Sequence, residues 1–280
     1  MSNTVCTLLY NKPFEYPIDL DKKFINNSCG LSNQLVQIVN MLFEGRQTFF
    51  IDLFSTDFRE GTMIPISTLL DLERMNSLYG LNLRDVIDMR QEDFNRGLTV
   101  IPWNGPFRCY LGNEARFREC ARKLEMSGSF RNIGKNLAEA KGVSDRIVNL
   151  IHLRIDWDFK DHCRYDIDPY YDSVVSKYEK EILRNCDPSI PLCLLLDSYE
   201  HELVGRLKET YEVIFVTKEE RNAYLPEKIQ GKRDIYAFCD FAFAKNLKVN
   251  NLFILENSRE TSSFSIMLKS CLNYSRVIAI

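Results

Sequence analysis

One stretch of the sequence is the most informative about the fold: Ile147-Val148-Asn149-Leu150-Ile151-His152-Leu153-Arg154-Ile155-Asp156. Its first residues are almost all apolar, which is typical of a β-strand that is covered on both faces in a parallel sheet. Towards the end, apolar residues alternate with His152, Arg154 and Asp156, and alternation along a strand places these three side chains on one face. The run therefore predicts a buried strand over residues 147–155 with a charged cluster at its carboxyl end.

Short β-rich runs alternate with helical stretches on both sides of this strand, a pattern typical of parallel sheets with covering helices. The other expected strands cover residues 5–10, 48–53, 85–89, 98–102, 192–196, 213–216, 235–239 and 252–255. Apolar residues at helical spacing predict helices over residues 32–43, 67–78, 171–184, 199–210 and 262–272.

The polar stretch 128–145 interrupts the hydrophobic pattern and predicts a domain boundary. We therefore expect an α/β fold of two Rossmann-like domains, residues 1–140 and 141–280, that face each other across a cleft. Ligands of such folds bind at the carboxyl ends of the strands.

Composition excludes several classes of protein. The 36 Lys and Arg residues nearly balance the 39 Asp and Glu residues, so no net positive field favours nucleic acid or an anionic membrane. No apolar run is long enough for a membrane helix, and the first twenty residues do not resemble a signal peptide. The nine cysteines are scattered without a Cys-x-x-Cys pair, which predicts a reducing, cytoplasmic location and no zinc site.

Three junctions between an expected strand and an expected helix contain polar residues that suit an anionic ligand. The first, Asn26–Gln34, contains Gly30, which allows close backbone approach, and Asn33, which offers an amide at a helix start. An ordinary capped turn is the alternative. The second is the strand end at Arg154, whose guanidinium can hold a diphosphate bidentately. A buried ion pair of Arg154 with Asp156 is the alternative there.

The third junction is Glu260–Ser265, which opens the last expected helix. Its hydroxyl groups and the N–H groups of the helix start can cradle a phosphate. Ser and Thr also cap helices that bind no ligand, so this signal alone is weak.

In this order, the Gly-x-x-Asn-Gln turn (30–34), the His-x-Arg-x-Asp strand end (152–156) and the Ser-Phe-Ser helix start (263–265) resemble the fucosyltransferase-like superfamily of GT-B glycosyltransferases. The likeness covers most of the chain but is specific only at these motifs. The segment Phe49–Phe58 and the compact size are similar to a short, virus-encoded branch that transfers xylose. The resemblance implies a GT-B-like fold and inverting transfer from a nucleoside-diphosphate sugar without a metal ion or other cofactor.

The resemblance also implies roles for individual residues. Arg154 would bind the β-phosphate of the donor, and His152 and Asp156 would support the arginine or bind the nucleoside. Gly30 and Asn33 would approach the donor phosphate or the sugars. Further phosphate contacts would come from Ser262, Ser263, Phe264 and Ser265.

The donor is expected to be UDP-xylose and the acceptor a fucose residue of an oligosaccharide or glycoprotein. Ile155 and Trp157 stand where fucosyltransferase patterns often have a second basic residue and an aspartate. These differences disfavour recognition of guanine. GDP-fucose as the donor of a fucosyltransferase is the alternative.

An inverting transferase usually needs a general base to deprotonate the acceptor hydroxyl, and Asp57 and Asp71 are the candidates. Two other hypotheses stay open. A metal-dependent transferase could use one of the Asp-x-Asp triplets at 19–21, 156–158 and 166–168. A catalytically silent protein that binds a nucleotide or a glycan could have the same two halves.

Overall fold

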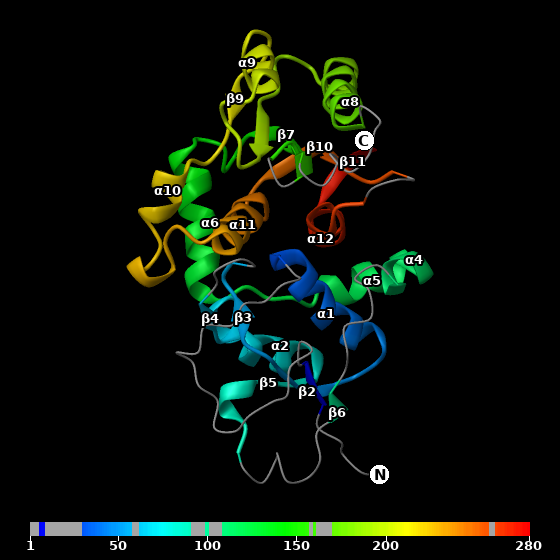
Figure 1. The fold of residues 1–280 in the computed structure, drawn as a ribbon, viewed down its shortest axis with the longest axis vertical. Helices are drawn as coiled ribbons and strands as arrows, with labels where there is room; N and C mark the ends of the chain where they lie inside the picture. Colours follow the sequence, from blue (N-terminus) through cyan, green and yellow to red (C-terminus); the bar gives the residue numbers. More distant parts are fainter. Residues whose placement is uncertain are drawn as a thin grey trace. The chain divides into compact units, whose positions relative to one another are not determined.

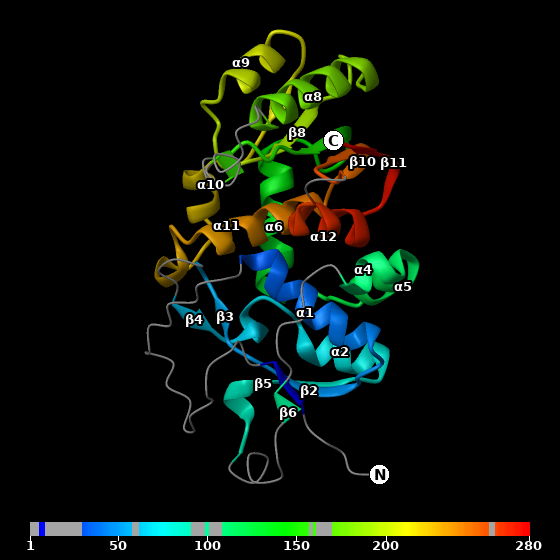
Figure 2. The same ribbon diagram turned by 45° about the vertical axis from the view of Figure 1, so that its right-hand side comes forward.

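The computed structural model describes residues 6–8, 30–57, 62–90, 99–100, 108–156, 159–160, 170–257 and 261–280. The chain forms two compact units, shown in Figures 1 and 2: unit 1 is Met1–Ile133 with Tyr224–Ala242, and unit 2 is Gly134–Ala223 with Phe243–Ile280. Each unit contains a parallel sheet and helices, which confirms the expected α/β class. The units differ from the continuous halves that the sequence predicts, because Tyr224–Ala242 packs with unit 1.

Unit 2 is built on a five-stranded parallel sheet with the order β11-β10-β7-β8-β9. Its strands are β7 (Ile147–His152), β8 (Leu192–Leu195), β9 (Val213–Ile214), β10 (Lys248–Ile254) and β11 (Tyr274–Ala279). The chain adds β8 and β9 on one side of β7 and then crosses to add β10 and β11 on the other. The strand order therefore reverses between β7 and β10, and ligands of such sheets bind beyond the carboxyl ends of the strands at this point.

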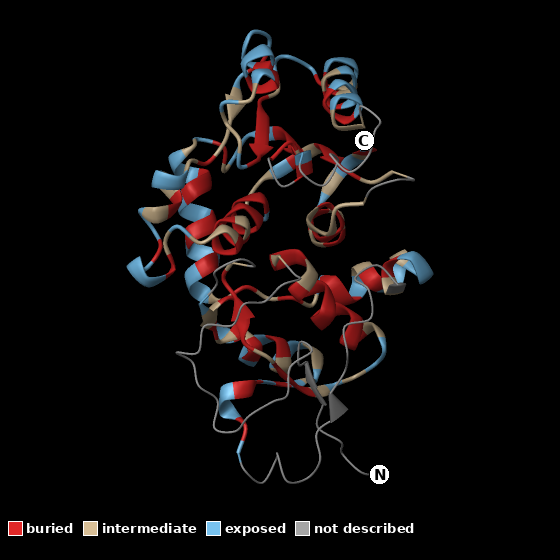
Figure 3. Cartoon of the chain, in the orientation of Figure 1, coloured by how far each residue is buried: buried red, intermediate tan, exposed pale blue. Residues whose placement is uncertain are grey.

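The core of unit 2 lies around β7, which is buried at every position after Ile147 (Figure 3). In the ladder, Ile151 pairs with Leu194 on one side and Phe253 on the other, and all three side chains are buried. The helices of this unit are α8 (Tyr170–Asn185), α9 (Glu202–Lys208), α10 (Lys218–Asn222) and α12 (Ser263–Cys271). Burial of both faces explains the nearly continuous apolar run from which the strand was predicted.

Unit 1 has a four-stranded parallel sheet with the order β5-β2-β1-β6 and a short antiparallel pair of β3 and β4. The strands are β1 (Cys6–Leu8), β2 (Thr48–Ile51), β3 (Phe54–Ser55), β4 (Met63–Ile64), β5 (Asn82–Asp85) and β6 (Thr99–Val100). The helices are α1 (Leu31–Phe43), α2 (Leu72–Tyr79), α4 (Arg108–Gly112) and α5 (Glu114–Ala121), with 3-10 turns η1 (Ile66–Thr68), η2 (Val86–Asp88) and η3 (Glu227–Ile229). No helix in the described ranges has both the length and the apolar character of a membrane span.

Two helices replace features that the sequence predicts differently. The expected strand 235–239 is wrong, because these residues lie in α11 (Arg233–Ala244). Its apolar residues Ile235, Phe238 and Ala242 are buried at helical spacing, but the run is apolar at so many positions that periodicity does not distinguish strand from helix. The polar stretch 128–145 contains α6 (Gly128–Ala140), which buries one face and exposes the other.

The third difference concerns the expected strand 85–89. Strand β5 ends at Asp85, and η2 follows directly. The buried carboxylate of Asp85 accepts hydrogen bonds from the backbone N–H of Ser67 at 3.3 and 3.4 Å. This contact lies at the point where the strand stops.

Asp234 fixes the later segment Tyr224–Ala242 in unit 1. Its Oδ1 accepts a hydrogen bond from Leu31 N at 3.0 Å, in the first turn of α1. Its own backbone N donates to Thr56 O at 3.0 Å, just after β3. Asp234 is 3% exposed, and a carboxylate at this position is stabilised by the partial positive charge of the helix N-terminus. Through its side chain and its backbone, Asp234 therefore joins three segments that are separate in the sequence.

The first prediction concerns this buried carboxylate. Asp234→Ala removes the acceptor of the Leu31 N–H, and we expect it to lower the free energy of unfolding by about 2 kcal/mol, because a buried donor loses its partner. Urea unfolding, followed by circular dichroism, measures the change. Asp71→Ala, which removes a half-exposed cap of α2, is the matched control and should cost about 1 kcal/mol or less. An Asp234→Ala protein as stable as the wild type would contradict this role.

Candidate functional site

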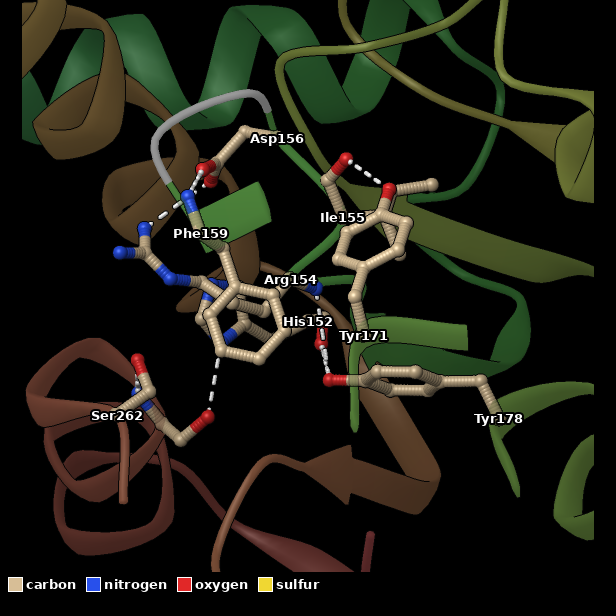
Figure 4. A network of polar contacts seen from close by, with 9 residues as sticks. His152, Arg154, Ile155, Asp156, Phe159, Tyr171, Tyr178 and Ser262 are labelled. Atoms are coloured by element: carbon tan, nitrogen blue, oxygen red, sulfur yellow. Dashed lines mark hydrogen bonds and ion pairs between the residues drawn. The ribbon is translucent and has the colours of Figure 1, made fainter. Parts of the chain in front are cut away.

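The carboxyl end of β7 places His152, Arg154 and Asp156 together in unit 2 (Figure 4). The strand ends at His152 and not at Ile155 as expected, because Ile155 N donates to Leu153 O at 3.0 Å and turns the chain. The three polar residues still gather at the edge of the sheet where the strand order reverses. The predicted cluster is thus formed by a strand end and a turn.

Arg154 is held by an ion pair with Asp156, with Nη1 at 3.0 Å from Oδ2. The other carboxylate oxygen of Asp156 accepts a hydrogen bond from Phe159 N at 2.8 Å, which fixes the carboxylate. The guanidinium also lies 5.9 Å from the centre of the Phe159 ring. The Arg154 side chain keeps 26% of its surface exposed. The ion pair that the sequence left as an alternative is present, but it orients a cation that solvent reaches.

His152 joins this strand end to the start of α12. Its Nδ1 lies 2.8 Å from Ser265 Oγ, and the hydroxyl of Ser265 also accepts a hydrogen bond from Leu255 N at 3.0 Å. The imidazole meets the ring of Phe264 edge to face, with the centroids 4.9 Å apart. Burial, with a smaller contribution from the charge of Arg154, lowers the pKa of His152 to about 3. The imidazole is therefore neutral at physiological pH, and it connects the end of β7 to the start of α12 without adding a charge.

The start of α12 divides into exposed and buried hydroxyls. Ser262 is the N-cap, and its Oγ accepts a hydrogen bond from Ser265 N at 3.5 Å. Ser262, Ser263 and Phe264 are half-buried, so a ligand can reach them. Ser265 is 0% exposed, and both of its Oγ contacts are internal. In this structure the hydroxyl of Ser265 connects β7, β10 and α12, and the phosphate contact expected of Ser265 stays a prediction.

Gly30 and Asn33 lie at the start of α1 in unit 1. Gly30 is the N-cap, and a Cβ there would lie 3.3 Å from Asp234 Oδ1, so glycine suits this close approach. The amide of Gln34 exchanges two hydrogen bonds with the backbone of Ser55, at 2.9 and 3.2 Å. The Asp234 carboxylate already occupies the start of this helix. A phosphate at the same position would meet a like charge, which disfavours the phosphate role considered for this turn.

The two candidate bases lie in different surroundings of unit 1. Asp57 is half-buried and follows the Ser55–Thr56 segment that contacts Gln34 and Asp234. Asp71 is the N-cap of α2: its carboxylate accepts a hydrogen bond from Arg74 N at 3.0 Å and pairs with Arg131 at 3.2 Å. Asp57 therefore follows directly on a segment that α1 and α11 hold, whereas Asp71 stabilises the start of α2.

A metal site does not emerge from the described residues, which contain no group of three or more His, Cys, Asp or Glu side chains that could hold an ion. The triplets 19–21 and 166–168 and residue Asp158 lie outside the described residues. Asp156 lies within them and is engaged by Arg154 and Phe159.

Several residues of these clusters were not singled out from the sequence. Asp234 and Leu31 are 203 positions apart, and nothing in a single sequence connects them. Tyr171 and Tyr178 of α8 donate hydrogen bonds to the backbone on either side of Arg154. Their spacing of two helical turns is visible in the sequence, but it also fits an ordinary buried helix face.

Two parallel sheets, each with a reversal of strand order, define the chain as an α/β protein of the GT-B type, with two Rossmann-like units. Known structures share this fold. POFUT1 in complex with GDP-fucose superposes with a TM-score of 0.53 at 10% identity, over 91% of this chain and 96% of that chain. POFUT1 in complex with GDP gives 0.53 at 11% identity, over 100% and 98%. The fucosyltransferase NodZ from Bradyrhizobium gives 0.51 at 12% identity, over 87% and 90%.

No family model matches the sequence, and no curated protein matches it either. At 10 to 12% identity the structural likeness shows the fold. The activity has to be argued from the residues of the site.

The second prediction concerns the pH dependence of stability. The folded chain keeps His152 neutral down to a pKa of about 3, whereas an unfolded histidine binds a proton below about pH 6.5. Lowering the pH below 6.5 therefore favours the unfolded chain through this residue, by up to ~1.4 kcal/mol per pH unit until pH 3. Urea unfolding at several pH values measures this slope.

His152→Asn is the matched variant, because a short amide can still contact Ser265 but does not titrate. We expect it to be less stable at pH 7 and to lose less stability than the wild type between pH 6 and pH 4.5. Equal slopes for the two proteins would show that His152 does not titrate as proposed.

Proposed function

We propose that the chain is an inverting glycosyltransferase that takes a sugar from a nucleoside diphosphate and transfers it to a hydroxyl of a glycan. The observation that supports this most is the contact between His152 and Ser265, which joins a cationic strand end to a helix start in unit 2. A fixed guanidinium and a helix N-terminus are complementary elements of a phosphate site. The same fold occurs in POFUT1, whose structures hold GDP-fucose or GDP, and in the fucosyltransferase NodZ.

In the proposed reaction, the acceptor oxygen attacks the anomeric carbon and its proton passes to a carboxylate. The bond between the anomeric carbon and the β-phosphate oxygen breaks, and the nucleoside diphosphate leaves with the electron pair. Arg154 stabilises the charge that develops on this leaving group, and Asp156 holds the guanidinium in place. Ser262, Ser263 and Phe264 add hydroxyl and backbone N–H donors at the start of α12.

Unit 1 is the proposed acceptor-side unit. We assign Gly30 and Asn33 to sugar hydroxyls and not to phosphate, because the carboxylate of Asp234 lies at the same helix start. Of the two candidate bases we prefer Asp57. The carboxylate of Asp71 is already engaged as a helix cap and in an ion pair with Arg131.

The third prediction tests the central cation. Arg154→Ala should lower the rate of transfer at least 100-fold, because about 3 kcal/mol of leaving-group stabilisation is lost. Steady-state kinetics with the best donor measures the change. Arg206→Ala is the control, since Arg206 lies in the same unit but pairs with Glu179 at an exposed position. Transfer by Arg154→Ala at nearly the wild-type rate would refute the assignment.

The fourth prediction concerns the donor and the metal. Since Arg154 supplies the positive charge that a divalent cation supplies in metal-dependent transferases, transfer is expected to persist in EDTA. Thermal-shift measurements with UDP, GDP, UDP-xylose and GDP-fucose identify the base, because a ligand of the folded state raises the melting temperature. We expect UDP and UDP-xylose to stabilise the protein, with a fucose-containing glycan as the acceptor.

Each alternative has its own outcome in these assays. Stabilisation by GDP and GDP-fucose alone would identify a fucosyltransferase. Loss of transfer in EDTA that Mn²⁺ or Mg²⁺ restores would show a metal-dependent enzyme. Binding of a nucleotide without transfer to any glycan or hydrolysis of the donor would show a binding protein.

A further inference from the structure

The backbone from Arg154 onwards lies past the last hydrogen bond between β7 and the neighbouring β8. The last ladder contact of β7 on the β8 side is the hydrogen bond from Leu153 N to Leu195 O at 3.0 Å. From Arg154 onwards, the backbone N–H and C=O groups need other partners, because an unsatisfied buried polar group is costly. These partners determine how firmly the guanidinium of Arg154 is placed.

Tyr178 of α8 supplies the partner on one side of Arg154. Its hydroxyl donates to His152 O at 2.7 Å and accepts a hydrogen bond from Arg154 N at 3.4 Å. Tyr178 is 0% exposed, and burial raises the pKa of its phenol, so the group remains a hydrogen-bond donor. One hydroxyl therefore connects the backbone of the two residues that hold the phosphate-binding elements together (Figure 4).

Tyr171 supplies the partner on the other side. It lies seven residues before Tyr178 on α8, on the same face of the helix, and its hydroxyl donates to Ile155 O at 2.9 Å. The same oxygen lies 3.3 Å from His201 Nε2. Because His201 Nδ1 accepts a hydrogen bond from Leu203 N at 3.1 Å, its proton is on Nε2 and is donated to Tyr171.

Tyr171 also contacts Phe159 and Lys160, which follow Asp156 in the sequence. The ring of Phe159 lies 6.0 Å from that of Tyr171, and Lys160 Nζ lies 5.5 Å from the centre of the Tyr171 ring. Phe159 N is the donor that fixes the Asp156 carboxylate. The backbone on both sides of the guanidinium, and the carboxylate that orients it, thus depend on α8.

We propose that Tyr171 and Tyr178 are positioning residues, which hold the Arg154 backbone so that its guanidinium meets the departing diphosphate. They act through Arg154, and neither of them touches the substrate. This inference rests on the proposed transferase function. A small displacement of such a group has a large effect, because misplacement by about 1 Å can cost on the order of 100-fold in rate.

Tyr178→Phe tests the inference, since it removes one oxygen atom and keeps the ring. We expect kcat to fall about tenfold while KM for the donor changes less than twofold, because the loss is felt mainly when charge develops on the leaving group. Tyr211→Phe is the control: this buried tyrosine of unit 2 donates to Cys186 O at 3.4 Å, and its loss should leave kcat unchanged. Tyr171→Phe, at a half-buried position, is the second variant if Tyr178→Phe does not fold.

The decisive comparison uses Arg154→Ala as the background. If Tyr178 acts through Arg154, adding Tyr178→Phe to Arg154→Ala should not lower the rate further. A purely structural tyrosine would give the same loss in both backgrounds, and that result would overturn the inference. So would a Tyr178→Phe enzyme, or in its place a Tyr171→Phe enzyme, with the kcat of the Tyr211→Phe control.

Hydrogen exchange separates the failure of this inference from that of the proposed function. The amide of Arg154 should exchange at least tenfold faster in Tyr178→Phe than in Tyr211→Phe, because its acceptor is gone. Equal exchange rates would overturn the positioning role whether or not the protein has transferase activity. If the exchange difference is present but the wild-type protein transfers no sugar, the proposed function is refuted. The hydrogen bond from Arg154 N to Tyr178 is then still supported.

Discussion

The hydrogen bond between His152 Nδ1 and Ser265 Oγ is the contact on which the candidate site of unit 2 depends. Ser265 Oγ also accepts from Leu255 N, so one buried hydroxyl joins the ends of two neighbouring strands and the first turn of α12. A neutral imidazole suits this position, because a second positive charge beside Arg154 would be costly in a buried place. The site therefore consists of the Arg154 guanidinium and the N-terminus of α12, which the uncharged pair of His152 and Ser265 connects.

Much of the fold could be predicted from periodicity. The apolar run at residues 147–155 and the alternation of strand and helix candidates identify a parallel α/β protein, since strands covered on both faces are apolar throughout. Helix α11 could not be predicted from this signal, because its apolar residues are too dense for a helical period to be distinguished from a strand. Helix α6 was missed for the opposite reason: a strongly amphipathic helix has enough polar residues to resemble a linker.

The candidate site could be predicted only where its residues are close in sequence or follow one another in a strand. Arg154 and Asp156 could be predicted together because one residue separates them in the sequence. The burial of Ser265 could not be read from a Ser-Phe-Ser motif, since the three residues of a helix start face different directions. The link between Leu31 and Asp234 depends on tertiary structure alone.

The later segment of unit 1 has a consequence for biosynthesis. Tyr224–Ala242 belongs to unit 1 but is translated after Gly134–Ala223, which belongs to unit 2. Domains of a nascent chain generally fold in order from the N-terminus, yet here the first turn of α1 has to wait for Asp234 to leave the ribosome. During that interval the N–H of Leu31 and the carbonyl of Thr56 lack their partner in Asp234, and this is the stage of synthesis at which a chaperone would protect the chain most.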